Sequence, residues 1–534
     1  MKFGVFTFLF FFTIISLHAQ SPIVEWQKCL GGSGYESPGS LIQLRDSNYL
    51  VVGNTGSNDG NVTLNHGLKD FWVIKTDQNG NIIWQRCYGG SHNDMAIRVV
   101  ETNNNRLLVT GFSASWDGDV SGNHSAITHY DAWAIMLDNQ GNLLWQKCYG
   151  GTGDEFMYQT METSDSSFIL VGSTTSNDFD VSGNHSQDTS DVWIIKIDSV
   201  GNLIWQKCFG GTNEDIAFSV IASYGDGFIV IGETKSNNGD ISFLHDSLGN
   251  YQDIWVVKIS SSGDIDWEKT FGGSAVETGW DVCKDTGFSY TILGHTTSHD
   301  GDISSNHAIN YTYDMWLLNI DSTGNLQWEK CFGGSASEFG YSFIRSNDGY
   351  ILAGLTISID GDVSGLHTQN GYDNWIIGID SLRNIEWNRC YGGTQDEYFS
   401  SIIKTFDQGY IISSSTSSNN GDVSGHHNPN YATDFWLLKI SSPYVSITEA
   451  SSHPQFITNY FTEDKTLHVI FNSHTEKNGT LQILDITGKI IFVKSINSKI
   501  GKNEFDFQIG SLSKGIYIVR LLGDNEIITS KVYY

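Results

Sequence analysis

The residues that most resemble a chemical site lie in a polar motif, DGDVSGNH, that begins at Asp117. Asp117, Asp119 and Ser121 place an oxygen at every second position, and the next residue is a glycine that permits a sharp turn. Calcium-binding loops present their oxygen ligands in this alternation. A further aspartate, Asp131, would complete the ligand set if the loop folds back. The motif therefore predicts Ca2+ as the one candidate cofactor, against the alternative of a loop held by hydrogen bonds.

The same oxygen pattern recurs in two further copies, at Asp178, Asp180 and Asp191 and at Asp360, Asp362 and Asp373. An EF-hand loop also needs a bidentate glutamate at its twelfth position. The three copies instead hold Thr128, Thr189 and Gly371 there. Three other copies replace one acidic residue by asparagine, at Asn61, Asn238 and Asn420. The calcium prediction therefore rests on the three complete copies.

A histidine follows the second acidic position of this motif by five residues in all seven copies, at His66, His124, His185, His245, His307, His367 and His427. A carboxylate also lies four residues after each glycine pair, at Glu36, Asp94, Glu155, Asp215, Glu277, Glu338 and Glu397. An active site needs unlike groups at one place, so this repetition argues against catalysis and favours a hydrogen-bonded scaffold. Zinc would need three or four soft ligands that converge, and the sequence shows no such cluster.

These motifs belong to a unit of about sixty residues that the sequence repeats seven times. One tryptophan series marks WQKC-like segments, at Trp26, Trp84, Trp145, Trp205, Trp267, Trp328 and Trp387. A second series ends the pattern Asp-x-Trp, at Trp72, Trp133, Trp193, Trp255, Trp316, Trp375 and Trp436. Within a unit, apolar and alternating runs separated by turns predict four antiparallel strands. Seven such units predict an all-β fold, a seven-bladed β-propeller.

The phase of the repeat predicts how the ring closes. The segment 23–29 has the pattern of a lone fourth strand, and the seventh unit ends after its third strand, 434–440. The N-terminal strand would thus complete the last blade, whereas a solenoid of stacked repeats, the alternative, would not explain the split unit. The pattern over 23–440 resembles the sixty-residue propeller repeats of secreted bacterial proteins. WD-repeat propellers use a comparable Asp/His/Trp network, although their Trp-Asp ending is missing here.

Six of the seven cysteines occupy one repeat position, at Cys29, Cys87, Cys148, Cys208, Cys331 and Cys390. Equivalent positions in neighbouring blades should lie farther apart than the ~7 Å between Cα atoms that a disulfide allows. We therefore expect small, buried apolar side chains at these positions. The odd count leaves at least one free thiol in any case.

A specific ligand site should depart from the repeat. In a four-stranded blade, the loop between the second and third strands and the crossover to the next blade share one face of the ring, which here receives the long loops. Trp116 is expected at a loop tip, where an indole stacks on a sugar ring or a protein partner. The departures that we select as ligand candidates are Trp116, His129, Tyr130, Trp280 and His299.

The two ends of the chain differ from its centre. Residues 1–19 join a lone lysine to an apolar run and a final small residue, which predicts a signal peptide. The net charge of −30 lies entirely before residue 441, since the rest holds nine Lys and Arg against nine Asp and Glu. So acidic a surface repels phosphate backbones, which excludes nucleic acid as a partner. No later apolar run has the length of a membrane span, so we expect no transmembrane segment in the mature protein.

The C-terminal part predicts a second domain. Residues 441–455 have the composition of a linker, and 456–534 hold an independent set of strands. Their order and motifs, DITGK and LSKGIYIVRL, resemble the C-terminal sorting domain of the type IX secretion system of Bacteroidetes-type bacteria. The resemblance implies a small β-sandwich, the type IX machinery as a partner, and export through the periplasm to the cell surface or beyond. The motif residues are Gly488, Lys489, Gly515, Tyr517 and Lys531.

Together these features predict an exported recognition or adhesion module, without catalytic activity, for a glycan or a protein. The sequence holds no serine-nucleophile motif and no phosphate-binding glycine loop, so we assign no catalytic residue. A polysaccharide-active hydrolase or lyase with a carboxylate pair on the loop face is the alternative. A purely structural surface protein is a third interpretation.

Overall fold

The computed structural model describes residues 21–442 and 457–533, except 126–127, 187, 247, 308–310, 347, 368–370, 428–431, 462–465, 474–476, 486–488, 500, 509–515 and 523–526. The described residues form β-strands and no helix. The chain divides into two compact units, Met1–Val445 and Ser446–Tyr534. The predicted signal peptide, 1–19, and most of the predicted linker, 441–455, lie outside the described residues.

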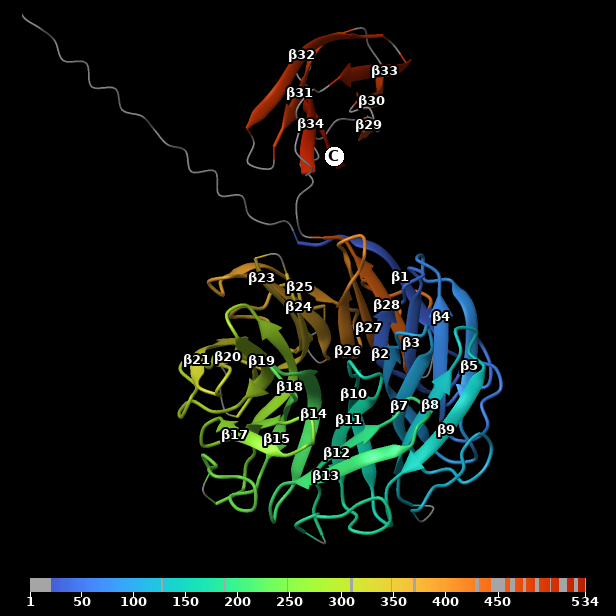
Figure 1. The fold of residues 1–534 in the computed structure, drawn as a ribbon, viewed down its shortest axis with the longest axis vertical. Helices are drawn as coiled ribbons and strands as arrows, with labels where there is room; N and C mark the ends of the chain where they lie inside the picture. Colours follow the sequence, from blue (N-terminus) through green and yellow to red (C-terminus); the bar gives the residue numbers. More distant parts are fainter. Residues whose placement is uncertain are drawn as a thin grey trace, which may run out of the picture. The chain divides into compact units, whose positions relative to one another are not determined.

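The first unit is a ring of seven four-stranded antiparallel sheets, which confirms the predicted propeller (Figure 1). We number these blades 1 to 7 along the chain. Blades 1 to 3 contain, in sheet order, β2 (Glu36–Gln43), β3 (Tyr49–Thr55), β4 (Asp70–Thr76) and β5 (Ile82–Tyr88); β6 (Asp94–Glu101), β7 (Leu107–Ser113), β8 (Asp131–Leu137) and β9 (Leu143–Tyr149); and β10 (Glu155–Glu162), β11 (Phe168–Thr174), β12 (Asp191–Ile197) and β13 (Leu203–Phe209). Blades 4 to 6 contain β14 (Asp215–Ala222), β15 (Phe228–Thr234), β16 (Asp253–Ile259) and β17 (Ile265–Phe271); β18 (Glu277–Asp285), β19 (Ser289–Thr296), β20 (Asp314–Asp321) and β21 (Leu326–Phe332); and β22 (Glu338–Arg345), β23 (Gly349–Thr356), β24 (Asp373–Asp380) and β25 (Ile385–Tyr391).

Blade 7 joins the two ends of the ring. Its strands are β26 (Glu397–Lys404), β27 (Tyr410–Thr416), β28 (Asp434–Ile440) and, outermost, β1 (Val24–Leu30). Strand β1 pairs antiparallel with β28, so that Cys29 lies opposite Trp436. The predicted closure of the ring by the N-terminal strand is therefore confirmed.

The core of each blade lies in its second and third strands, whose apolar runs are buried on both faces. All seven residues of β7 and of β8 are buried, for example. The tryptophans of the Asp-x-Trp series are the largest of these side chains, and each buries on the order of 200 Å². Their ring N–H groups remain satisfied, because Trp193 Nε1 donates to Gln206 Oε1 of the outermost strand over 3.0 Å. This pairing explains the glutamine of the WQKC segments.

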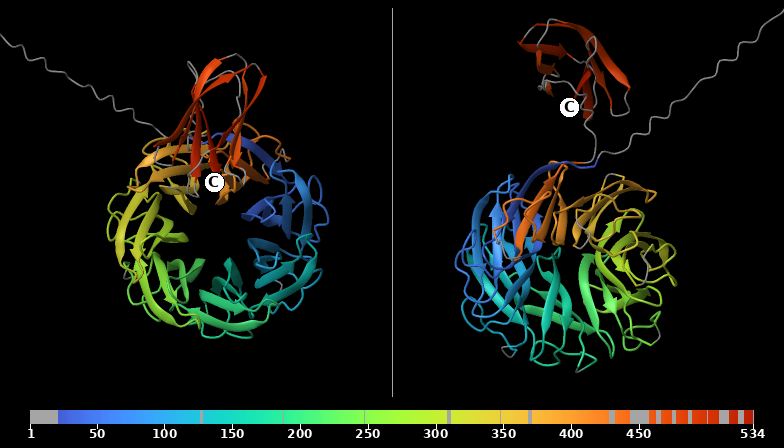
Figure 2. Two further views of the ribbon diagram at one scale, coloured as in Figure 1. Left: turned by 45° about the horizontal axis from the view of Figure 1, so that its top comes forward. Right: turned by 180° about the vertical axis from the view of Figure 1, so that it is seen from behind.

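The first strand of every blade is the innermost one. Each contacts the first strands of both neighbouring blades, and Figure 2 shows them around the axis of the ring. We call the region that these seven strands enclose the channel. A β-bulge interrupts each of these strands near its middle, as between Met157 and Gln159 in β10. Because a bulge re-aims side chains, the residue at this point departs from the alternation of the strand.

The cysteines behave as the sequence predicts. All seven are free thiols, and those of the repeat position are buried except for Cys208, which is half-buried. Burial raises the pKa of the Cys148 thiol well above its ordinary value. A thiol of this kind stays protonated and unreactive at neutral pH.

The second unit contains two sheets. One holds β29 (Ile457–Phe461), β30 (Thr466–Ser473) and β33 (Gly501–Gln508), and the other holds β32 (Ile490–Ser498), β31 (Lys477–Leu484), β34 (Ile516–Leu522) and β35 (Ile527–Tyr533). Buried residues of both sheets, such as Leu467 of β30 and Val519 of β34, share one apolar core. Two sheets around one core form a small β domain of the predicted kind.

Candidate functional site

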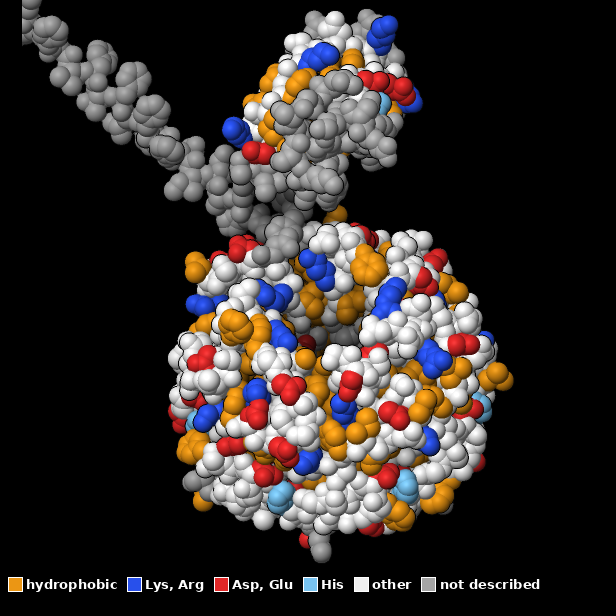
Figure 3. All heavy atoms as spheres, in the orientation of Figure 1, with side chains coloured by type: hydrophobic (Ala, Val, Ile, Leu, Met, Phe, Trp, Pro, Cys, Tyr) orange, Lys and Arg blue, Asp and Glu red, His pale blue; other side chains and the backbone are white. Residues whose placement is uncertain are grey.

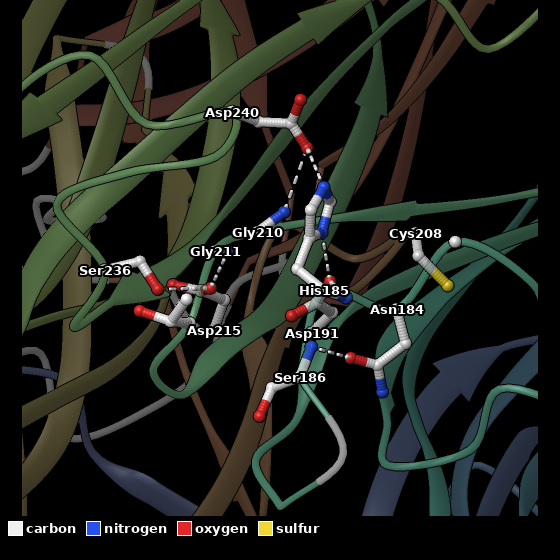
Figure 4. A network of polar contacts seen from close by, with 12 residues as sticks. Asn184, His185, Ser186, Asp191, Cys208, Gly210, Gly211, Asp215, Ser236 and Asp240 are labelled. Atoms are coloured by element: carbon white, nitrogen blue, oxygen red, sulfur yellow. Dashed lines mark hydrogen bonds and ion pairs between the residues drawn. The ribbon is translucent and has the colours of Figure 1, made fainter.

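In every blade, a histidine–aspartate pair ties the loop between the second and third strands to the start of the third strand. His185 and Asp191 form one such pair, in which the backbone N–H of His185 also donates to Asp191 Oδ2 (Figure 4). The seven Nδ1–Oδ2 distances are 2.6–2.8 Å, in His66–Asp70, His124–Asp131, His185–Asp191, His245–Asp253, His307–Asp314, His367–Asp373 and His427–Asp434. The loop that carries the DGDVSGNH motif, or its counterpart, is thus fixed to its own blade.

The glycine pair that leads from one blade to the next passes between two buried carboxyl groups. A Cβ on Gly210 would lie 2.5 Å from Asp215 Oδ2 and 2.7 Å from Asp191 Oδ1. Gly211 donates its N–H to Asp215 Oδ2 over 2.8 Å. A side chain at Gly210 would collide with both carboxyl groups, so glycine is required there.

The same network connects neighbouring blades. Asp240 of blade 4 accepts a hydrogen bond from Gly210 N over 3.1 Å, and its Oδ2 lies 3.8 Å from His185 Nε2 of blade 3 (Figure 4). His245–Asp302 and His367–Asp422 repeat this contact at 3.5 and 3.6 Å. Loop, crossover and strand are therefore linked from one blade to the next.

The first residue of each innermost strand is a buried carboxyl group. Burial, with a smaller contribution from Asp131, raises the pKa of Glu155 to about 7, although hydrogen bonds from Ser176, Thr174 and Gly151 N act in the opposite direction. Burial likewise raises the pKa to about 7 in Asp94, Glu277, Glu338 and Glu397, and to about 6 in Asp215. These carboxyl groups are repeated around the ring and buried in it, which suits a structural role better than catalysis of one reaction.

The acidic residues of the loop motif serve as hydrogen-bond acceptors for the crossover. Asp117 Oδ1 accepts from Ser91 N over 2.7 Å, and Asp119 Oδ2 accepts from Gly89 N over 3.3 Å. Asn238 makes the first bond in its own blade, to Thr212 N, over 2.9 Å. Because an uncharged amide oxygen accepts the same hydrogen bond, the position of Asp117 requires an acceptor rather than a negative charge.

The other predicted calcium ligands are engaged in the same way. Ser121 Oγ accepts from Gln146 Nε2, Asp178 from Thr152 N, Asp180 from Gly150 N, Asp360 from Ser335 N and Asp362 from Gly333 N. Asp131, Asp191 and Asp373 accept from the paired histidines. Among the described residues, no three His, Cys, Asp or Glu side chains come together as metal ligands. Calcium binding stays a prediction, tested below.

The innermost strands break the sevenfold symmetry. At their bulge positions, four consecutive blades hold Tyr158, Phe218, Trp280 and Tyr341, which we call the aromatic arc. Successive ring centroids lie 5.3, 4.2 and 5.2 Å apart, and Phe218 stacks on Trp280. The other three blades hold Ser400, Gly39 and Ile97 there.

Further aromatic rings extend the arc towards the face with the long loops. Tyr130, which directly precedes β8, lies 5.7 Å from Phe156, and Phe156 lies 6.4 Å from Tyr158 of the arc. Phe112 packs edge-on against both Tyr130 and Phe156. A continuous path of aromatic rings therefore leads from a loop of blade 2 to the innermost strand of blade 6.

A pocket of about 560 Å³ adjoins this path between blades 3 and 4. Phe156, Tyr158 and Ile216 form its apolar wall. Hydroxyl, amide and carboxylate groups form the rest, from Asp154, Ser173, Thr175, Asp188, Thr189, Ser190, Asn213 and Glu214, with Lys235. Glu214 is paired with Lys235 over 2.5 Å. Pockets that fix a small ligand combine such an aromatic wall with a few polar groups.

Blade 5 adds a buried histidine to the channel wall. The rings of Tyr313, Phe339, Trp280 and Tyr341 surround His295 with centroids 5.0–6.4 Å away. Burial lowers the pKa of His295 to about 3, so the ring is neutral at physiological pH. Neither His295 Nδ1 nor Trp280 Nε1 has a hydrogen-bond partner among the described residues. The sequence shows these residues as departures in blade 5 but not their contact.

The five predicted ligand residues fall into two groups. Tyr130 and Trp280 belong to the aromatic path, and Trp280 lies in β18 rather than on a loop. His129 holds Asp154 of the pocket, with Nδ1 3.1 Å from Asp154 Oδ2. Trp116, 53% exposed, and His299, exposed as well, lie apart on loops of blades 2 and 5.

The sorting-domain motif is partly described. Asp485 and Lys489 close the DITGK turn by two hydrogen bonds of 3.0 Å, one from Asp485 N to Lys489 O and one from Lys489 N to Asp485 Oδ1. Tyr517 is buried in the core of the domain. Lys531 lies in β35, opposite Ile518. Gly488 and Gly515 lie outside the described residues.

Comparison with known protein families identifies this second unit. Residues 463–533 match the model of the secretion system C-terminal sorting domain. The C-terminal unit is a sorting domain. It marks the chain for export by type IX secretion, to the cell surface or the extracellular space, and makes the type IX machinery a partner. Among the residues described, no helix is long and apolar enough to cross a membrane.

The sequence matches no curated protein. Among solved structures, the Pan2 WD40 domain of Neurospora crassa has 9% identity and a TM-score of 0.41, over 77% of this chain and 95% of that one. The extracellular domain of the hybrid two-component system BT3049 of B. thetaiotaomicron has 9% identity and a TM-score of 0.27, over 93% and 67%. A puromycin hydrolase has 8% identity and a TM-score of 0.41, over 86% and 60%.

Proposed function

We propose that the exported protein is a non-enzymatic recognition module that binds a glycan along the aromatic arc and in the adjoining pocket. The observation that carries this proposal is the arc itself. Four aromatic residues occupy one position on consecutive innermost strands, and the other three blades have none there. Sugar rings present C–H faces that stack on aromatic side chains, and such amphipathic rings are strong recognition elements.

The polar groups beside the arc suit the hydroxyl groups of a sugar. The pocket offers hydroxyl, amide and carboxylate groups next to Phe156 and Tyr158. In the arc itself, the buried Trp280 Nε1 has no hydrogen-bond partner among the described residues. The network that repeats in all seven blades supports this function indirectly, because it holds the innermost strands in fixed positions.

The test is a screen of neutral and acidic oligosaccharides, followed by calorimetric titration of each one that binds. We expect Trp280→Ala and Tyr158→Ala to weaken the binding at least tenfold, because each removes a stacking face. The matched control is Phe179→Ala, which removes an aromatic ring that is 69% exposed at a loop tip of blade 3. Melting curves check that each variant is folded. Unchanged affinity in both folded arc variants, or no glycan bound by the native chain, would overturn the proposal.

A protein ligand is the second candidate, and the exposure of Trp116 favours it. An indole that is 53% exposed on a loop is suited to a flat protein surface rather than to the channel. In this case Trp116→Ala weakens binding and the two arc variants do not. The same three variants therefore distinguish the two ligand classes.

A further inference from the structure

Two innermost strands carry a charged residue just after the bulge. Arg98 of β6 and Asp281 of β18 both directly follow the bulge of their innermost strands. Asp281 raises the pKa of Arg98, and Arg98 lowers that of Asp281, although burial, the larger effect, acts in the opposite direction on each. Blades 2 and 5 are as far apart in the ring as two blades can be. The other five blades hold Ser40, Gln159, Ser219, Ser342 and Ser401 at this position.

The two charges differ in their hydrogen bonding. Asp281 accepts three hydrogen bonds, from Val282 N over 2.9 Å and from Ser342 Oγ and Phe343 N over 3.2 Å each. Arg98 donates from Nε to Gln159 Oε1, and the structure describes no ion pair between it and any carboxylate. Asp281 is therefore satisfied by the wall, whereas the guanidinium fork of Arg98 is not.

A half-buried guanidinium that forms no ion pair can bind an anion. Its planar fork matches a carboxylate or a sulfate with two parallel hydrogen bonds. Figure 3 shows acidic and basic side chains side by side around the central hollow on one face, so no broad basic surface competes for an anion there. The net charge of −30 repels anions at long range, but at physiological salt that repulsion is screened beyond about 8 Å.

We propose that Arg98 is the anion subsite of the channel, and that the glycan bound there is an acidic one, with a carboxylate or sulfate group on a sugar ring that stacks on the aromatic arc. This inference rests on the proposed function and names its ligand class. Gln159, which holds Arg98, directly follows Tyr158 of the arc in β10. A sugar that stacks on Tyr158 can therefore place an acidic substituent beside the guanidinium.

The experiment compares three probes by calorimetric titration of the full chain: a galacturonate trisaccharide, a sulfated oligosaccharide and a neutral oligosaccharide of equal length. We expect the native chain to bind one of the acidic probes at least tenfold more tightly than the neutral probe. Arg98→Gln should remove this preference, so that the acidic and neutral probes bind with similar affinity. The matched control is Arg86→Gln, since Arg86 is exposed on an outermost strand. The better of the two acidic probes identifies carboxylate or sulfate as the group.

Further variants separate failure of this inference from failure of the proposed function. Arg98→Lys keeps the charge but loses the fork, and should retain part of the preference. Melting curves identify any variant that does not fold. If the native chain binds neutral and acidic probes equally, or if folded Arg98→Gln keeps the preference, Arg98 is not the subsite, and glycan binding by the arc still stands. If no probe binds, or if Tyr158→Ala and Trp280→Ala change nothing, the proposed function fails as well.

Discussion

The loop network and the channel wall differ in one respect that separates structure from function. The His–Asp pairs, glycine pairs and buried carboxyl groups recur in all seven blades with nearly the same distances. The residues at and after the inner bulges change from blade to blade, from Gly39 to Trp280 and from Ser40 to Arg98. Repetition is what a closed ring needs for its stability, whereas one ligand needs unlike groups at one place. Candidate ligand-binding residues are therefore found at the positions that differ between the blades.

Tryptophan occurs both among the repeated residues and among the departures from the repeat, which makes the comparison direct. Trp193→Ala should lower the free energy of unfolding by about 3–5 kcal/mol, because it empties a site that is 0% exposed in the core. Trp116→Ala, at an exposed loop tip, should change it by no more than about 0.5 kcal/mol. Denaturant unfolding of both variants measures the two values. Equal losses would mean that the exposed ring also supports the fold.

The network should make stability depend on pH. The raised pKa values of Glu155, Glu277 and the equivalent residues mean that the folded state keeps protons that the unfolded state has released above its ordinary pKa near 4.5. Stability from these groups is thus complete below that value and is lost as the pH rises through about 7. One such group contributes up to about 1.4 kcal/mol per pH unit.

Melting temperatures at pH 5, 6, 7 and 8 measure this effect, and we expect them to fall along the series. The raised pKa values of His185, His245 and His367 act in the same direction. Glu155→Gln removes one of these groups and should make the decline smaller. A melting temperature that rises towards pH 8 would contradict the assignment.

A single His–Asp pair should contribute less to the free energy of unfolding than a core tryptophan does. His185→Ala leaves a buried carboxylate with one hydrogen bond fewer and should cost about 1–3 kcal/mol of stability. Substitution of the exposed His299 by alanine is the matched control and should be neutral. Thermal unfolding compares the two variants, and an equal effect would show that pairing does not matter.

Removal of calcium should have the smallest effect. The aspartate oxygens of the loop motif already accept N–H groups of the crossover, and Asn238 does so without a charge. We therefore expect melting curves with EDTA and with added calcium to coincide. A calorimetric titration with four to seven sites and a large rise in melting temperature would instead establish these loops as calcium sites.

The ring and its closure could be predicted from the sequence because they depend on residues that repeat. Tryptophan, glycine and histidine recur at fixed spacings, and the split unit indicates that the first strand completes the last blade. The direction of the oxygens in the DGDVSGNH loops could not be predicted. Spacing shows which side chains carry oxygen. It does not show that Asp117 and Asp119 accept hydrogen bonds from N–H groups of a crossover about thirty residues away.

The residues of the channel wall were harder to predict because they do not repeat. The innermost strands share little besides their first carboxyl residue, so no pattern marks the bulge that turns Trp280 towards Phe218. Trp280 is therefore recognisable in the sequence as a departure, but its place in the channel is not. The charges of Arg98 and Asp281 affect each other's pKa although blades 2 and 5 are not neighbours, a relation that only the folded ring creates.

The pairing of β1 with β28 delays the completion of blade 7 until late in folding. Trp436 and its hydrogen-bond partner Gln27 lie 409 residues apart in the chain. Closing so long a loop costs on the order of 5 kcal/mol of chain entropy. At about 5–20 residues per second, a ribosome spends roughly 20–80 seconds between the two strands. Until then the chain holds an unpaired first strand, and a product that stops before residue 434 presents an open edge to other chains.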